Sequence, residues 1–331
     1  MRITLSSKVV ALTAGVAIAV GAQALLPQAA TAAAPPSATV ASAAMTHGSH
    51  RLHRLPSAVN KHPAHVSAAA HRSAGKAVGG GRVTAARATA WVTGNTAGRG
   101  LRLLYGGAVA AAIGKIFFTL GGTDYVCSGA LVRSRHAYVV LTAAHCVRNG
   151  RGQWATDWTF VPGYKDGAQP YGQYTARRFF VSPRWTGPDT GSERYDVAFV
   201  QVVRATPDGE RSRAAGAPAG LPIRFAASQT AAQPIRAYLF GYPALPPYTG
   251  LYANYCAGRA ARTPTRPGSV QTACGMTAGD SGGPWLTGFS PRAETGTITA
   301  VTAFKLSGDL RLLYGTVLGP AARALYLKAS A

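Results

Sequence analysis

The chain has 331 residues, of which 47% are apolar and only 14% are charged. This balance excludes a wholly disordered chain, which needs low hydrophobicity and high charge to stay unfolded. The length allows about two domains, and 34 Lys and Arg against 11 Asp and Glu give a formal net charge of +23.

The excess of positive charge is unevenly distributed. Residues 1–104 hold 11 basic residues and no acidic ones, whereas residues 105–331 carry a net charge of +12. Such basicity suits acidic surfaces, and an acidic cell-surface polymer is a candidate partner. No zinc-finger spacing, RNA-binding signature or basic helix with heptads is present, so we expect no specific nucleic-acid binding. A solvated Arg-rich surface is the simpler interpretation.

Residues 1–34 have the order of a secretory signal peptide. Arg2 and Lys8 precede an apolar run over residues 9–26, and small residues follow, with cleavage expected after Ala32 or Ala34. An uncleaved membrane anchor is the alternative, since the run approaches the ~20 residues of a membrane span. The small-residue exit favours the signal peptide. We therefore expect a secreted protein without a transmembrane segment in its mature form.

Residues 35–104 are predicted to be a disordered basic leader. They are rich in Ala, Ser, Gly, His and Arg and show neither helical nor strand periodicity. Six of the eight histidines lie here, but their loose spacing favours a solvated segment over a metal site. The position of this segment suggests the propeptide of a zymogen, with Arg87, Arg99 and Arg102 as cleavage points.

The region from residue 105 onward is predicted to be all-β. Short apolar or alternating runs recur between Gly, Pro and Asp, as is typical of a sandwich or barrel. An apolar-poor stretch over 204–222 divides the region into units of about 105–210 and 221–331, and a helix is expected after Pro320. The expected strands are 112–120, 130–132, 138–142, 159–161, 179–181, 197–203, 236–240, 297–304 and 310–318, and the expected helix is 321–329.

Four cysteines follow residue 105, and an even number in an exported protein predicts disulfides. They are Cys127, Cys146, Cys256 and Cys274. Four cysteines allow three connectivities, among which the residues alone do not choose. The two local pairs would each close a loop of about 20 residues, worth ~3 kcal/mol in the chain-entropy model. No Cys-x-x-Cys spacing exists, so we expect no metal site and no cofactor.

Three stretches carry the residue types of acyl transfer. His145 follows an apolar run, Asp196 opens another, and Ser281 lies among glycines. A serine hydroxyl becomes a good nucleophile when an imidazole takes its proton, and a buried carboxylate holds that imidazole in one tautomer. The oxyanion needs backbone N–H donors, which we assign to Gly279 and Ser281.

Each stretch alone is a weak signal. The histidine could be a buried core residue, the aspartate a capping residue, and Gly279-Asp280-Ser281-Gly282-Gly283 also fits the nucleophile elbow of α/β-hydrolases. The order along the chain discriminates, because those hydrolases run Ser, Asp, His, whereas this chain runs His, Asp, Ser. The combination therefore favours another class of serine hydrolase.

Residues Thr142–Cys146, Asp196 and Gly279–Pro284 resemble the trypsin/chymotrypsin-like serine peptidases, in particular secreted bacterial members. The resemblance extends from about Gly114 to the C-terminus. It implies two chymotrypsin-like antiparallel β-barrels with the site in the cleft between them, followed here by a C-terminal helix. His145 and Asp196 would come from the first barrel and Ser281 from the second. The stretch from Cys127 resembles the family strand whose cysteine pairs with the one after the histidine, which implies Cys127–Cys146.

The substrate pocket departs from the digestive enzymes. By resemblance it involves Gly275, Thr302, Ala303 and Phe304. Gly275 stands where an aspartate would select Arg or Lys, so we expect a small or medium apolar side chain at the cleavage site. The family usually has a serine that supports the catalytic aspartate; Ala303 occupies that position here, or Thr302 if the alignment shifts by one.

Asp280 precedes the predicted nucleophile and needs a positive partner if it is buried. In the family a freed N-terminus or an internal arginine serves this purpose.

Taken together, the motifs lead us to expect a monomeric, secreted serine endopeptidase that cleaves polypeptides. The alternatives are a catalytically silent relative that binds acidic polymers, and an esterase that uses the same triad.

Overall fold

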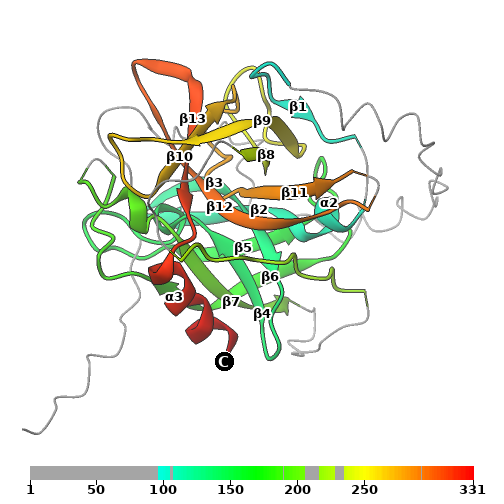
Figure 1. Cartoon of the computed structure of the whole chain (residues 1–331). Coiled ribbons are helices and arrows are strands. Elements are labelled where there is room, and N and C mark those ends of the chain that lie inside the picture. The colour runs from blue at the N-terminus through cyan, green and yellow to red at the C-terminus, as the bar shows by residue number, and fades with distance from the viewer. Residues whose placement is uncertain (1–95, 105–106, 189, 206–215, 228–234, 292) are drawn as a thin grey trace, which may run out of the picture. The chain divides into compact units, whose positions relative to one another are not determined.

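The computed structural model describes residues 96–104, 107–188, 190–205, 216–227, 235–291 and 293–331 (Figure 1). The predicted signal peptide and the predicted leader up to residue 95 lie outside the described residues. The described part consists mainly of antiparallel strands, as the all-β prediction requires. None of its helices has the length and hydropathy needed to span a bilayer.

The six strands from β2 to β7 close into a barrel. Their order around it is β2-β3-β4-β7-β6-β5, all antiparallel. The strands are β2 (Ile113–Leu120), β3 (Thr123–Val132), β4 (Tyr138–Thr142), β5 (Thr156–Pro162), β6 (Gln173–Val181) and β7 (Ala198–Ala205). Helix α2 (Ala108–Ala112) precedes them, and two single turns, η3 (Ala144–Cys146) and η4 (Glu193–Tyr195), lie in the connections.

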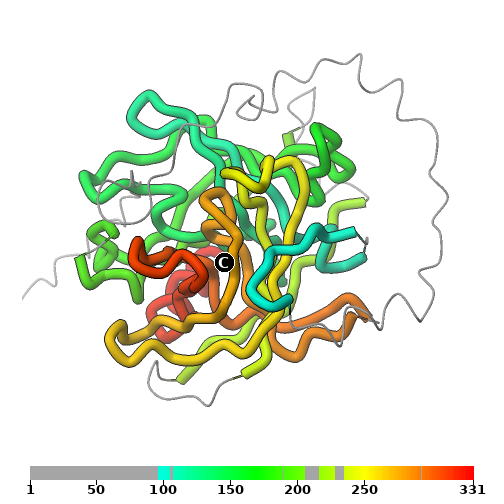
Figure 2. Tube along the Cα trace, turned by 90° about the horizontal axis from the view of Figure 1, so that it is seen from above, coloured from blue at the N-terminus to red at the C-terminus, as the bar shows by residue number. Residues whose placement is uncertain are grey.

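The second barrel also has six strands, because β8 pairs with both β9 and β11. The strands are β8 (Ile235–Gly241), β9 (Asn254–Arg262), β10 (Ser269–Ala273), β11 (Pro284–Ser290), β12 (Thr295–Leu306) and β13 (Asp309–Val317). A seventh strand, β1 (Leu101–Arg102), pairs with β9 outside the ring and runs beside it in Figure 2. The two-barrel fold is therefore confirmed.

The C-terminal helix α3 (Pro320–Ser330) follows the second barrel but packs on the first. It contacts β4, β6 and β7, and its Tyr326 hydroxyl donates to the carbonyl of Arg133 at 2.6 Å. A proline in the first turn starts the helix, as predicted. The chain end thus joins the two barrels.

All nine predicted strands fall on observed ones, whereas β9, β10 and β11 were missed. β9 is Asn-Tyr-Cys-Ala-Gly-Arg-Ala-Ala-Arg, in which small residues replace the β-branched side chains on which strand prediction relies. β1 lies inside the segment that we predicted as leader, since pairing with β9 satisfies its backbone groups. The folded part therefore begins before residue 105.

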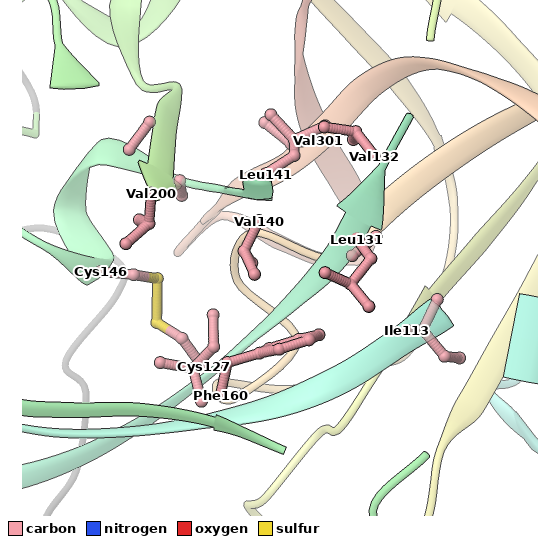
Figure 3. Packing of buried hydrophobic residues seen from close by; sticks show 14 of the residues in the cluster. Ile113, Cys127, Leu131, Val132, Val140, Leu141, Cys146, Phe160, Val200 and Val301 are labelled. Carbon is pink, nitrogen blue, oxygen red and sulfur yellow. A yellow bond between two sulfur atoms is a disulfide. The ribbon is translucent and has the colours of Figure 1, made fainter. Parts of the chain in front are cut away.

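Both local disulfides are present. Cys127–Cys146 joins β3 to η3 and lies among the buried side chains of the first barrel (Figure 3). Cys256–Cys274 joins β9 to the segment that follows β10. The structure thus decides the connectivity that the residues left open, and its Cys127–Cys146 bond agrees with the pairing that the family resemblance implied.

The two barrels share one apolar core, and a lysine is buried within it. Lys115 on β2 is 0% exposed, and its ammonium donates to the carbonyl of Gly250 at 2.8 Å. Its Nζ lies 4.9 Å and 5.0 Å from the ring centroids of Phe117 and Tyr164. Burial lowers the pKa of Lys115 to about 7. A residue of the first barrel therefore anchors a loop of the second.

We expect the stability conferred by Lys115 to increase with pH. Between pH 7 and 9 an unfolded lysine stays protonated while the buried one loses its proton, so the unfolded state binds more protons and stability rises, by up to about 1.4 kcal/mol per pH unit. Chemical denaturation measures the unfolding free energy of the wild type and of Lys115→Met. The value for the wild type minus the value for Lys115→Met should increase from pH 7 to pH 9. Lys165→Met, at an exposed position, controls for the loss of a lysine. A pH-independent difference would contradict the prediction.

Candidate active site

Two predicted site residues form a buried hydrogen-bonded pair. His145 lies in η3 directly after β4, and Asp196 follows η4 before β7. The His145 Nδ1 and Asp196 Oδ2 atoms are 2.8 Å apart, and the backbone N–H of His145 donates to Oδ1 at 3.0 Å. The residues are 0% and 3% exposed. The carboxylate therefore orients the ring, so that the other ring nitrogen, Nε2, is the one left for chemistry.

The aspartate is supported differently from the expectation. The Thr302 hydroxyl accepts a hydrogen bond from the Trp285 indole N–H at 3.0 Å, and Ala303 has no polar group. Neither position therefore supports Asp196 with a hydroxyl. Instead, the carboxylate receives the His145 backbone N–H, a contact that needs no additional side chain.

The turn that carries Asp196 is held by the second barrel. The Asp196 N–H donates to the Glu193 carbonyl at 3.0 Å, and the Thr316 hydroxyl on β13 donates to the same oxygen at 2.7 Å. The Arg266 guanidinium lies 3.6 Å from the Glu193 carboxylate. The contacts of Glu193 with Thr316 and Arg266 join residues more than 70 positions apart, which is why sequence patterns did not indicate them.

Ser281 is brought against the histidine segment. Its carbonyl accepts the Ser128 N–H at 2.8 Å and lies 3.7 Å from Cys146 Sγ. At Gly282, φ is +79° and a Cβ would lie 2.1 Å from Thr142 Oγ1, so only glycine permits this approach. Ser281 is 4% exposed. The segment that contains Ser281 and the turn that contains His145 therefore pack directly on each other.

The two atoms predicted to react, His145 Nε2 and Ser281 Oγ, carry no hydrogen bonds to described residues. His145 Nε2 is buried without a partner, and no contact is observed for Ser281 Oγ. Catalytic hydrogen bonds are often long in unliganded enzymes and tighten when the substrate binds. Neither atom is therefore occupied by a hydrogen bond to another described residue.

The backbone around Ser281 distinguishes the two predicted oxyanion donors. The N–H groups of Asp280, Gly282 and Gly283 donate to Thr277, Thr302 and Asp280 carbonyls, respectively. Among the described residues, the N–H groups of Gly279 and Ser281 find no such acceptor. These two donors are thus the ones free to bind an oxyanion.

Neighbouring segments hold this stretch in place. The Ser128 hydroxyl donates to the Gly279 carbonyl at 2.7 Å, and the Ala244 N–H donates to the Ala278 carbonyl at the same distance. The Thr277 hydroxyl donates to the Leu245 carbonyl at 2.9 Å. The segment before the serine therefore contacts both barrels without pairing as a strand.

The one cluster of potential metal-ligating side chains in the described part of the chain is already engaged in other bonds. In the described part of the chain, Cys127, Cys146 and His145 come close together. The two sulfur atoms form the disulfide and the imidazole is bonded to Asp196. This group of side chains therefore offers no metal site.

The predicted pocket strand contains a buried cation that sequence reasoning missed. Lys305, 6% exposed, follows Phe304, which stacks on Tyr314 with ring centroids 4.9 Å apart. The Lys305 ammonium donates to the carbonyls of Cys274 at 2.5 Å and Leu310 at 2.6 Å. A single charged residue, Lys305, inside the uncharged and largely apolar stretch 300–306 was the available signal. The backbone N–H of Gly275, at the predicted base of the pocket, donates to the carbonyl of Gly98.

Asp280 is buried without an ion pair. It is 3% exposed, its Oδ2 has no hydrogen-bond partner, and no arginine of the described chain lies within ion-pair distance of it. Burial raises the pKa of Asp280 to about 7, although Lys305 and His145 act in the opposite direction. The partner expected for this carboxyl group is thus not an arginine of the described residues.

We expect Asp280→Asn to gain stability relative to the wild type as pH rises from 4 to 7. The native carboxyl group keeps a proton that the unfolded one loses, so the wild type becomes less stable over this range and the amide does not. Denaturant titrations at several pH values measure the difference. Asp309→Asn is the control: Arg311 lowers the pKa of Asp309 below its ordinary value of 3.8, so the effect of this substitution should stay nearly constant from pH 4 to 7. A constant difference for Asp280→Asn would contradict the prediction.

Comparison with known proteins shows that the chain is similar to a family of proteases. The trypsin-like peptidase domain matches residues 127–288. The protease Anisep from Arthrobacter nicotinovorans is 34% identical over 67% of this chain and 97% of its own, with a TM-score of 0.58. A thermostable serine protease, AL20, from an extremophilic microorganism is 28% identical with the same coverage and TM-score. No curated protein sequence matches.

A more distant solved structure has the same architecture. A Glu endopeptidase is 18% identical over 70% of this chain and 96% of its own, with a TM-score of 0.54, which is a likeness of fold alone. The two barrels and both disulfides fit the same family as the 34% identity to Anisep. The chain belongs to the trypsin-like family of serine proteases.

Proposed function

We propose that this protein is a secreted serine endopeptidase that uses His145, Asp196 and Ser281. The observation that carries the proposal is the buried His145–Asp196 hydrogen bond of 2.8 Å, which leaves Nε2 free beside the segment of Ser281. A structural histidine would be expected to use both ring nitrogens once buried. Two disulfides suit an oxidising, extracellular compartment.

The proposed reaction proceeds through an acyl-enzyme. Ser281 Oγ attacks the carbonyl carbon of the scissile peptide bond while His145 Nε2 takes the hydroxyl proton. The oxyanion is bound by the N–H groups of Gly279 and Ser281, and Asp196 stabilises the imidazolium. The imidazolium then protonates the leaving amine as the carbon–nitrogen bond breaks. Water, activated by the same nitrogen, releases the acid and restores the serine.

The other candidates from the sequence are less well supported. A silent relative that binds acidic polymers would have no use for a free Nε2 beside a serine and two free N–H donors. An esterase would use the same groups with an alcohol as the leaving group. Similarity to the protease Anisep favours peptide bonds.

We expect a fluorophosphonate probe to label the wild type and not Ser281→Ala, because labelling requires an activated serine. Asp196→Asn should react about 10⁴-fold more slowly, the magnitude known for a triad whose histidine takes the wrong tautomer. Gel fluorescence with time measures both rates. Ser307→Ala, at an exposed position in the turn between β12 and β13, controls for loss of a serine. Labelling of Ser281→Ala would refute the assignment.

The charged groups near the predicted pocket support an apolar preference at the cleavage site. The three protons of the Lys305 ammonium face the carbonyls of Cys274, Leu310 and Leu312. Asp309 is bound by Arg311 at 3.0 Å. Neither charge is therefore available to pair with a substrate side chain.

A peptide library should thus be cleaved after small or medium apolar residues, at least tenfold faster than after Arg, Lys, Asp or Glu. Mass spectrometry of the products measures the preference. A strict preference for an acidic residue would instead show that Lys305 leaves its carbonyl partners on substrate binding. Parallel assays with an ester substrate separate the esterase alternative.

A further inference from the structure

We propose that the second barrel contains a binding site for a fatty-acid anion of about ten carbons, in a cavity at the end of the barrel where β8 begins and β13 ends. None of the residues that line this cavity belongs to the proposed triad. The proposal therefore goes beyond the proposed function and does not depend on it.

The cavity lies within the ring of six strands. Its volume is about 280 Å³, and every strand of the ring contributes at least one lining residue. Strand pairing places Ala300 directly beside both Trp285 and Val317. The cavity is therefore part of the barrel interior and is more than a groove on its surface. The strands contribute, in chain order, Ala237, Ala260, Val270, Trp285, Ala300 and Val317.

Small side chains leave this space open. In a narrow barrel the inward-facing side chains normally fill the centre, as Phe160 and Val200 do in the first barrel. In the second barrel, Leu239, Met276 and Leu313 belong to the same buried cluster as the three alanines that line the cavity. An alanine buries as readily as a leucine but occupies less volume, so the burial of these positions is kept while the space is not filled.

The walls of the cavity suit an apolar ligand. Trp285 is 1% exposed, and its indole N–H already donates to the Thr302 hydroxyl at 3.0 Å, so the ring offers no free donor. Ile235, also in the lining, is 48% exposed. An apolar cavity of roughly 150 Å³ stays dry and binds benzene. A cavity about twice as large should therefore hold a chain of about ten carbons.

The charges beside the cavity select the head group. Among the described residues that line it, the charged ones are Arg224 and Arg262, and none is an aspartate or glutamate. Arg224 is exposed and forms no ion pair with a described carboxylate. A guanidinium binds a carboxylate through two parallel hydrogen bonds. The ligand would thus place its alkyl chain inside the barrel and its carboxylate at Arg224.

Calorimetric titration of the full chain with decanoate, below the concentration at which it forms micelles, tests the site. We expect saturable binding of one decanoate per chain. Octanoate should bind about 15-fold more weakly, because each buried methylene contributes about fourfold in affinity. Decanol, which has the same chain without the charge, should bind at least tenfold more weakly. Absence of saturable binding, or equal affinities for decanoate and octanoate, would overturn the proposal.

Two substitutions test the location of the ligand. Ala300→Leu fills part of the cavity and should weaken decanoate binding at least tenfold. Ala324→Leu adds the same side chain at an exposed position of α3 and should leave the affinity unchanged. Arg224→Gln should weaken decanoate binding about tenfold, the loss expected for a hydrogen bond to a charged group, and leave decanol binding unchanged.

Arg224→Gln decides the location even if Ala300→Leu does not fold, because Arg224 is exposed and its replacement leaves the core intact. Circular dichroism establishes which variants are folded. Decanoate binding that Arg224→Gln and a folded Ala300→Leu leave unchanged would overturn the proposal, since the ligand would then lie elsewhere. Fluorophosphonate labelling reports the proposed function separately, so either proposal can fail without the other.

Discussion

The buried pairing of His145 with Asp196 is the interaction on which the rest of the site depends. A carboxylate removed from water is costly unless its oxygens accept hydrogen bonds, and here the ring and backbone N–H groups of one residue satisfy both oxygens. The aspartate and histidine lie 51 positions apart, so β4 and β7 must be neighbours for them to meet, as they are. Residues of the first barrel alone therefore form this pair, and Ser281 comes from the second barrel.

Close packing between the two barrels positions Ser281 relative to this pair. Gly282 fits against Thr142 only because it lacks a side chain, and Ser128 binds both the Ser281 segment and Tyr242. Lys115 adds a polar anchor in the same interface through Gly250. Small changes in how the barrels meet would thus alter the distance between the imidazole and the alcohol. The helix α3, which joins the second barrel to the first, restrains that motion.

Much of this arrangement could be predicted from the sequence, for identifiable reasons. The glycines beside Ser281 and the order His, Asp, Ser along the chain can be read directly from the sequence and predicted the site residues. Nine strands could be predicted because their sequences show apolar or alternating runs. The missed strand β9 is made of small residues that gain their place from neighbours. The support of Asp196 through Glu193 and Thr316 has no local signal, since the contact spans 123 positions. β1 was missed for the same reason, because Leu101 and Arg102 acquire strand structure only by pairing with β9.

The disulfide Cys256–Cys274 ties β9 to the first residue of the loop before Ser281. Because thiols inside most cells are kept reduced, this covalent link cannot persist until the chain reaches an oxidising environment. The loop that we propose to supply the oxyanion donors would lack one of its tethers while the polypeptide is still at its place of synthesis. In the secreted enzyme that we propose, oxidation outside that place would therefore protect the producing cell from proteolysis, in addition to stabilising the fold.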